Sequence, residues 1–155
     1  MSLVRRAVPE DAREVLRLRQ VMIDAVSGGD AGTWHEESLS GLRARLADPD
    51  GTFAAFVVDH PERPGALAAL AAGTAEYRIG RESNPRGVVG FVCSVATDPG
   101  TRRRGYSRRC VDELLAWFRG RGARQIQLTA SAEARPMYEA LGFRPKPDPL
   151  MELRL

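Results

Sequence analysis

The sequence predicts an α/β (α+β) protein with a mixed central sheet that carries helices on both faces. The main observation is a strand, helix, strand unit at residues 87–95, 102–119 and 125–129, because such a unit implies a parallel pair with a right-handed crossover. The strand-like segments before this unit are joined by short turns, which indicates antiparallel pairing. We therefore expect about six to seven strands, about four helices and a single domain over residues 1–155.

Elements of the first half are predicted from apolar spacing and turn residues. They are, in order, a strand at 3–8, a helix from Pro9 to about residue 26, a helix with leucines at 39, 42 and 46, a strand at 52–59 and a strand at 66–79. Thr33 and Glu36 have the spacing of a capping box for the second helix. The segment 66–79 is rich in alanine, which fits both helix and strand, but the turns on either side favour a strand.

The second half begins with an apolar run, 87–95, that reads as a buried strand and is broken by Pro99 and Gly100. The helix that follows carries apolar side chains at helical spacing and ends at the glycines of 120–122. Further on, the sequence predicts a strand at 125–129, a short helix at 132–141 and a final strand at 150–155, where apolar and polar residues alternate.

The start of the long helix has an unusual charge. The first turn of a helix has free N–H groups and the positive end of the helix dipole, where cations are disfavoured. Arg102, Arg103 and Arg104 nevertheless lie there, followed by Gly105. A strongly anionic ligand such as a phosphate or pyrophosphate would account for this placement.

Composition and short motifs exclude several classes of protein. The net charge of +3 is small, so the basic residues alone do not indicate nucleic acid. Cys93 and Cys110 give neither a disulfide framework nor zinc spacing, and no metal is expected. The sequence has no apolar run long enough to cross a bilayer and no signal peptide, so we expect a cytoplasmic protein without a membrane partner. No Gly-Lys-Ser/Thr follows the turn, and Gly105 lacks the other two glycines of a dinucleotide fingerprint, which excludes P-loop and Rossmann sites.

Two motifs resemble those of the GNAT superfamily of acyl-CoA N-acyltransferases. The first family motif is Arg/Gln-x-x-Gly-x-Gly/Ala after the central strand, and residues 102–107 read Arg-Arg-Arg-Gly-Tyr-Ser. The second family motif is Asn-x-x-Ala-x-x-Leu-Tyr-x-x-x-Gly-Phe, and residues 131–143 match it with Ser and Met in place of Asn and Leu. By order of elements the resemblance covers the whole chain, and it is strong over residues 87–145.

The resemblance implies an N-acetyltransferase that moves the acetyl group of acetyl-CoA to a primary amine by direct transfer in a ternary complex. It also implies that the strands at 87–95 and 125–129 separate at their C-terminal ends, that backbone next to this gap pairs with the pantetheine amides, and that the 102–107 loop holds the pyrophosphate. The donor-binding residues implied are Val95, Ala96, Thr97, Arg102, Arg103, Arg104, Gly105, Tyr106, Ser107 and Ser131. Tyr138 is the implied general acid, since a phenol can give a proton to the departing sulfur.

The sequence leaves the general base and the acceptor open. Glu76, Glu36 and Glu37 are candidate bases acting through water, although each is more often a solvated carboxylate. His35 is expected to be a surface loop residue, and His60, in a proline-rich turn, is expected to have no chemical role. The resemblance places acceptor contacts at about residues 24–40 and 78–87, where mixed charge fits a small amine, an aminoglycoside or a protein N-terminus equally well.

Two other functions and the oligomeric state also stay open. A non-catalytic acyl-CoA sensor of the same fold is one alternative, and a nucleic-acid-binding module is the other. The second rests on a cluster of arginines at 102–104, 108 and 109, but aromatic residues do not interleave with it, so a nucleic-acid partner is not expected. Members of the GNAT superfamily often dimerise, which makes a homodimer an open alternative.

Overall fold

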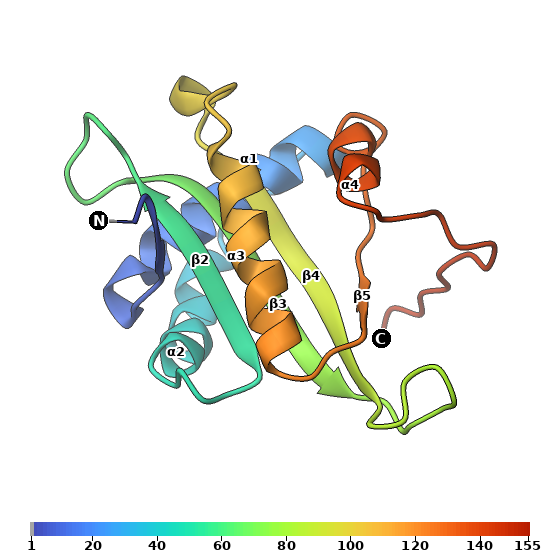
Figure 1. The fold of residues 1–155 in the computed structure, drawn as a ribbon. Helices are drawn as coiled ribbons and strands as arrows, with labels where there is room; N and C mark the ends of the chain where they lie inside the picture. The colour runs from blue at the N-terminus through green and yellow to red at the C-terminus, as the bar shows by residue number, and fades with distance from the viewer. Residues whose placement is uncertain (1) are drawn as a thin grey trace.

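A computed structural model describes residues 2–155, which form a sheet with strand order β1-β2-β3-β4-β5 (Figure 1). The strands are β1 (Val4–Arg6), β2 (Phe53–Asp59), β3 (Leu67–Tyr77), β4 (Val88–Thr97) and β5 (Gln125–Gln127). The helices are α1 (Ala12–Ser27), α2 (His35–Leu46), α3 (Tyr106–Gly120) and α4 (Arg135–Ala140), with short 3-10 helices η1 (Pro9–Asp11) before α1 and η2 (Pro99–Thr101) after β4. No helix in this described part is long and apolar enough to cross a membrane.

Strand pairing follows the prediction for the central part of the chain. β1 to β4 pair in sequence order and antiparallel, whereas β4 pairs with β5 in parallel. α3 provides the crossover between these two parallel strands. The predicted strand, helix, strand unit and its mixed sheet are therefore confirmed.

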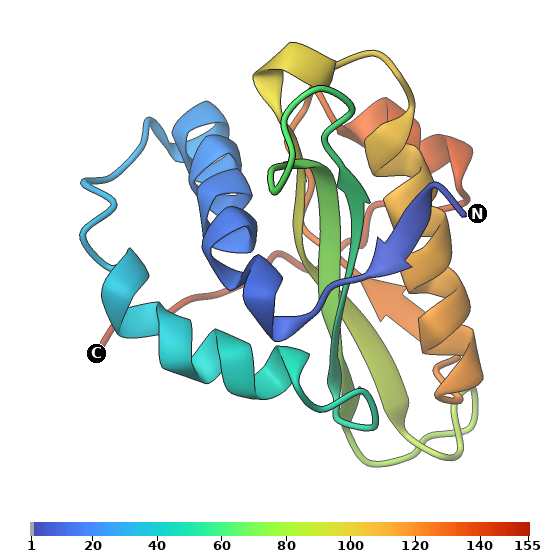
Figure 2. The same ribbon diagram turned by 90° about the vertical axis from the view of Figure 1, so that its left-hand side faces the viewer.

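Helices cover the two faces of the sheet, with α1 and α2 on one face and α3 on the other (Figure 2). The amphipathic face of α3 is buried on the sheet, and the ring of Phe118 lies against two glycines, Gly73 on β3 and Gly90 on β4. A Cβ atom at either glycine would come within 2.7 Å of that ring. These two positions need glycine because the aromatic ring occupies the space of a side chain.

The number of strands is smaller than predicted. The described residues form five strands instead of six to seven, and 150–155 is not a strand. The apolar side chains of this segment are instead 79% (Leu150), 91% (Met151), 83% (Leu153) and 114% (Leu155) exposed. Alternation of apolar and polar residues produces a strand only where a neighbouring strand supplies hydrogen bonds, and this segment has none here.

Two helix boundaries also differ from the prediction. The N-cap of α2 is Trp34 rather than Thr33, and no capping box forms because the Glu36 carboxylate binds Arg13 instead, at 2.6 Å. Residues 132–134 form a turn ahead of α4, which begins at Arg135 with Pro136 in its first turn. The fixed φ of proline suits that first turn, so α4 starts later than predicted.

Candidate functional site

The parallel pairing of β4 with β5 is short. It covers only Val89–Phe91 against Gln125–Gln127, so the C-terminal half of β4 has no partner on that side. A β-bulge interrupts the β3–β4 ladder between Ala72 and Gly73, and Cys93 is the extra residue on β4. The result is an open strand edge that begins at the bulge and runs to Thr97.

Backbone groups at this open edge can bind an extended ligand. The N–H of Asp98 donates to the carbonyl of Ala68 at 2.7 Å, which sets the alternation of the antiparallel β3–β4 ladder. By that alternation Val95 and Thr97 direct their N–H and C=O groups away from β3, whereas Ala96 directs its groups towards it. An extended chain with amide groups could therefore add to β4 as a further strand.

The loop after β4 is exposed and strongly basic. The side chains of Arg102, Arg103 and Arg104 reach solvent, and none has an acidic partner within ion-pair distance among residues 2–155. The first turn of α3 contains no acid, and its N-cap, Gly105, has φ of 75°. The free N–H groups of this turn and the three guanidinium groups thus lie at the end of the open β4 edge, where an anion would be bound.

Three further predicted donor residues have internal contacts. Tyr106 is half-buried and its ring packs against the α3 core, so its N–H is the group left for a ligand. The Ser107 hydroxyl donates to the carbonyl of Ala96 at 3.3 Å and also contacts the Thr97 hydroxyl. The Ser131 hydroxyl accepts the N–H of Ala134 at 3.2 Å and so stabilises the turn that leads into α4.

Tyr138 lies on α4 with its side chain packed edge-on against Phe143, at 5.7 Å between ring centroids. It is 7% exposed, and this burial raises the pKa of its phenol. Tyr138 lines a cavity of about 570 Å³ that is open to solvent and lies between β5, α4 and the C-terminal segment 144–150. A buried phenol with a raised pKa is protonated at neutral pH and can act as an acid.

A polar surface borders the same cavity on the sheet face opposite α3. Gly73 and Gly90 face α3, because Phe118 of that helix lies against both. Successive residues of a strand point to opposite faces of the sheet, so Glu76 on β3 and Phe91 on β4 lie on the face away from α3. Gln127 pairs with Phe91 and lies on that face too, since Arg78 donates both to Glu76, at 3.1 Å, and to Gln127, at 3.5 Å. The sequence placed Arg78 in a segment expected to contact the acceptor but missed Gln127, because only the register of three strands brings the two together.

The candidate bases and histidines occupy different places. Glu76 lies close enough to Cys93 for its charge to contribute to the raised pKa of that thiol, whose main cause is burial. Glu36 is bound to Arg13 on α1. The His35 ring packs edge-on against Trp34 and forms a hydrogen bond with Gln20 on α1. His60 is not a surface residue, since its side chain is 8% exposed and faces Asp98.

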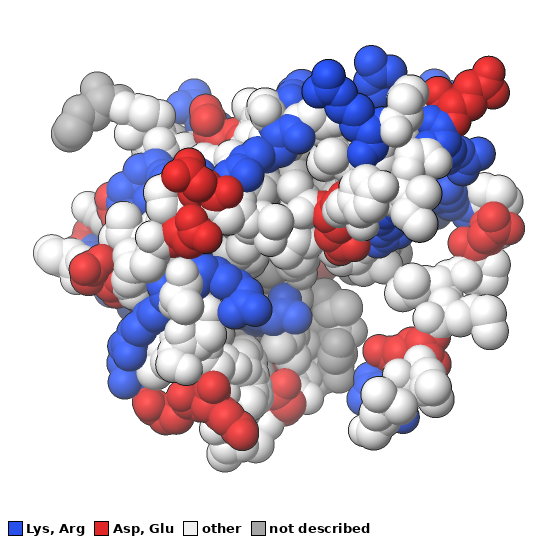
Figure 3. All heavy atoms as spheres, turned by 90° about the horizontal axis from the view of Figure 1, so that it is seen from below, with Lys and Arg blue, Asp and Glu red and all other residues white. Residues whose placement is uncertain are grey.

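The described residues contain no group of three or more His, Cys, Asp and Glu side chains that could hold a metal ion. The groups at the open edge and the loop that follows it are instead backbone amides and guanidinium groups. On the face drawn in Figure 3, basic and acidic side chains are interspersed.

Comparisons with known proteins identify the family of the chain. Residues 18–143 match the sequence model of the Acetyltransferase (GNAT) family. The chain is 30% identical, over 142 residues covering 84% of it and 82% of the relative, to glucosamine 6-phosphate N-acetyltransferase 1 of Oryza sativa subsp. japonica.

Solved structures show the same fold. A GCN5-related N-acetyltransferase from Ralstonia eutropha superposes with a TM-score of 0.80 at 24% identity, covering 97% of both chains. An acetyltransferase from Clostridium acetobutylicum, solved with acetyl-CoA, superposes with a TM-score of 0.78 at 22% identity, covering 97% of this chain and 94% of the other.

Proposed function

The chain belongs to the GNAT family of acetyltransferases, and we propose that it transfers the acetyl group of acetyl-CoA directly to a primary amine held in the same complex. The observation that carries this proposal is the open edge of β4, which leads through Asp98 and η2 into the arginine loop at the start of α3. An open strand edge suits the amides of pantetheine, and a basic helix N-terminus suits a pyrophosphate. Acetyl-CoA has both groups and supplies an acetyl group activated as a thioester.

The donor site that we propose consists of two parts. Val95 and Thr97 would bind the pantetheine amides through backbone N–H and C=O groups, with Ala96 between them. The pyrophosphate would be held by the N–H groups of 105–107 and by the guanidinium groups of Arg102, Arg103 and Arg104, through charge-assisted hydrogen bonds. Ser131 would contribute indirectly, through the turn that it stabilises before α4.

Two side chains would move protons. We assign Tyr138 as the general acid that protonates the leaving sulfur, because burial keeps its phenol protonated and it lines the cavity beside β5. Glu76 is the best placed of the candidate bases, because it shares the sheet face with Phe91 and Gln127 and lies near the bulge. It would take the proton of the amine through a water molecule.

We further propose that the acceptor amine carries an anionic group, as an amino sugar phosphate does. Arg144 and Lys146 line the cavity together with the ion pair Arg135–Glu139 and with Asp148. Neither Arg144 nor Lys146 has an acidic partner within ion-pair distance in the part of the chain that the structure describes. Gln125 and Gln127 line it too, and their amides could bind hydroxyl groups. The rice relative is named for acetylation of glucosamine 6-phosphate, a molecule with this combination of groups.

The test is acetyl-CoA turnover with glucosamine 6-phosphate, glucosamine, an aminoglycoside and a peptide N-terminus. We expect turnover with the phosphorylated sugar and little with glucosamine. Lys146→Ala should raise KM for the phosphorylated sugar about tenfold. Arg154→Ala, which removes a cation near the C-terminus that does not line the cavity, should leave KM unchanged. Equal turnover of both sugars would refute the anionic acceptor, and CoA binding without turnover of any amine would favour a sensor.

A further inference from the structure

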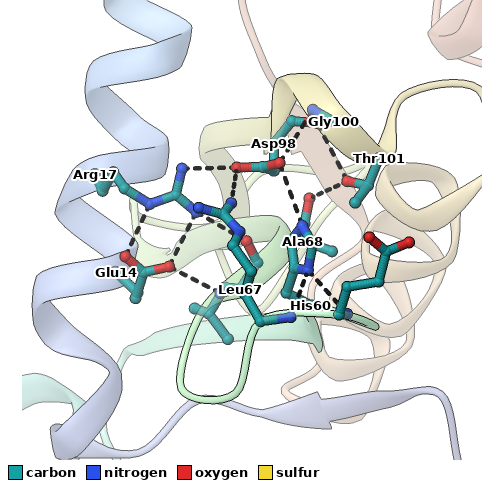
Figure 4. A network of polar contacts seen from close by, with 10 residues as sticks. Glu14, Arg17, His60, Leu67, Ala68, Asp98, Gly100 and Thr101 are labelled. Carbon is teal, nitrogen blue, oxygen red and sulfur yellow. Dashed lines mark hydrogen bonds and ion pairs between the residues drawn. The ribbon is translucent and has the colours of Figure 1, made fainter.

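A buried carboxylate lies directly before the arginine loop. Asp98 follows β4 and caps η2: its Oδ2 accepts the N–H of Gly100 at 3.1 Å, and its side chain is 5% exposed (Figure 4). Thr101 is tied to the same place, since its N–H donates to the Asp98 carbonyl at 2.9 Å and its hydroxyl donates to Ala68 at 3.2 Å. The backbone that enters the arginine loop is thus fixed on both sides of Pro99.

The other carboxylate oxygen joins distant parts of the chain. Asp98 Oδ1 accepts hydrogen bonds from Arg17 on α1, at 2.8 Å, and from Arg63 in the β2–β3 turn, at 2.9 Å. Glu14 holds Arg17 from its other side with bonds of 2.8 and 2.9 Å and also accepts the N–H of Leu67 at 2.8 Å (Figure 4). One carboxylate therefore connects α1, the β2–β3 turn and the end of β4.

His60 supports the turn that carries Arg63. Its Nδ1 accepts the N–H groups of Glu62 and Arg63, both at 3.1 Å, so in the neutral ring the proton lies on Nε2. Nε2 is 3.6 Å from Asp98 Oδ2. Both ring nitrogens are thus directed at this network, which explains why a histidine from a proline-rich turn is buried.

We propose that Asp98 is a positioning residue for acyl-donor binding, which holds the arginine loop at the angle to β4 that CoA requires. The proposal rests on the proposed function, since it assumes that the 102–107 loop binds the pyrophosphate. Asp98 touches neither part of the proposed donor site, yet it lies between them: Thr97 ends the open edge immediately before it, and η2 leads from it to Arg102. Its loss should therefore disturb the pyrophosphate loop more than the strand edge.

Asp98→Asn removes the contacts while keeping the shape. The amide has one acceptor oxygen, so its NH₂ group must face either the Gly100 N–H or the two guanidinium groups, and each choice sets donor against donor. The matched control is Asp11→Asn, because Asp11 is also ion-paired and largely buried: it binds Arg5 at 2.8 and 2.9 Å and accepts the N–H of Val8 at 2.8 Å. Asp11 lies at the start of α1 and contacts no part of the loop.

The experiment measures dissociation constants for CoA and for acetyl-pantetheine, which lacks the pyrophosphate, together with the melting temperature. We expect Asp98→Asn to raise the dissociation constant for CoA about tenfold and that for acetyl-pantetheine less than twofold. Asp11→Asn should lower the melting temperature but change the dissociation constant for CoA less than twofold. Arg63→Ala removes an exposed partner of Asp98 and should raise the dissociation constant for CoA about threefold. This variant keeps the test possible if Asp98→Asn fails to fold.

Each outcome decides the proposal. Wild-type affinity for CoA in Asp98→Asn, or in Arg63→Ala where the first variant does not fold, would overturn it. An equal loss of affinity for CoA and for acetyl-pantetheine in Asp98→Asn would also overturn it. So would a loss of CoA affinity in Asp11→Asn as large as that in Asp98→Asn, because both results would show a general effect of stability. Failure of the wild-type protein to bind CoA at all would refute the proposed donor site instead.

Discussion

Ser107, in the first turn of α3, donates a hydrogen bond of 3.3 Å to the carbonyl oxygen of Ala96 on β4. The same hydroxyl contacts Thr97. The family motif has a glycine or alanine at this position, so the serine could be either a ligand contact or a structural link. Its bonds to β4 favour the link, which holds the helix start against the open strand edge.

Ser107→Ala should therefore lower the free energy of unfolding by about 1 kcal/mol, the usual value of one such hydrogen bond. CoA affinity should change less than twofold, because the backbone N–H groups remain. Urea denaturation and calorimetric titration with CoA measure the two quantities. A large loss of CoA affinity at unchanged stability would show that the hydroxyl itself binds the donor.

Gly105 provides a test of loop conformation. A Cβ added at Gly105 or at Gly120 meets no atom within 4 Å. The two glycines differ in backbone conformation, since φ of Gly105 is 75° and that of Gly120 is not in the left-handed region. Gly105→Ala should cost about 1–2 kcal/mol of stability through the backbone alone and weaken CoA binding. Gly120→Ala should be neutral or stabilise α3 by up to about 1 kcal/mol and leave CoA binding unchanged. Thermal unfolding with and without CoA separates these outcomes, and similar behaviour of the two variants would contradict the assigned loop geometry.

Tyr138→Phe removes only the phenolic hydroxyl. If this group protonates the leaving sulfur, kcat should fall by about 10²–10⁴-fold while the dissociation constant for CoA is nearly kept. Burial raises the pKa of Tyr138, so its proton should be lost from the wild-type enzyme only above about pH 10. Tyr77→Phe is the control, since Tyr77 is 74% exposed. A wild-type kcat in Tyr138→Phe would show that the tyrosine is only packed on α4.

Cys93 reports on the open edge of β4. It is the exposed bulge residue, whereas Cys110 is fully buried and its burial raises the pKa of that thiol to about 12. Iodoacetamide should therefore label Cys93 alone in the folded protein, slowly, because burial of the sulfur also raises the pKa of Cys93. Saturating acetyl-CoA should reduce the labelling rate at least severalfold, as measured by mass spectrometry. An unchanged rate would place the donor away from the bulge.

Acid should destabilise the protein through Asp98 and Glu14. Burial opposes ionisation of both carboxylates, but hydrogen bonds from Arg17, and from backbone N–H groups, outweigh it and hold both pKa values below the usual range. The folded protein thus binds these protons less readily than the unfolded chain, so the stabilisation is complete above about pH 4 and is lost as pH falls through the lower folded-state values.

Urea denaturation between about pH 6 and pH 2 measures this dependence. The free energy of unfolding should fall with acidification, and Asp98→Asn should show a smaller fall because it has one proton-binding group fewer. Parallel curves for the variant and the wild type would mean that Asp98 does not contribute to acid sensitivity.

Local sequence patterns were sufficient for most of the fold. Helical spacing located α1 and α3, and apolar runs bounded by turn residues located β2, β3 and β4. The alternating segment at 150–155 shows the limit of this method, because alternation describes which side chains share a face and not whether a partner strand is present. The predicted cap of α2 failed for a similar reason: Glu36 could bind either its own helix start or Arg13, and packing of α1 against α2 selected Arg13.

The sequence by itself determined the family motifs, and with them the arginine loop at residues 102–107 and Tyr138 on its short helix. Only the tertiary structure decided where β4 and β5 separate, which face of the sheet Glu76 and Gln127 share, and that Asp98 binds Arg17 and Arg63. The physical reason is distance along the chain. A glycine turn or an apolar period is encoded within a few residues, but Arg17 and Asp98 meet only after the sheet has brought α1 beside the end of β4.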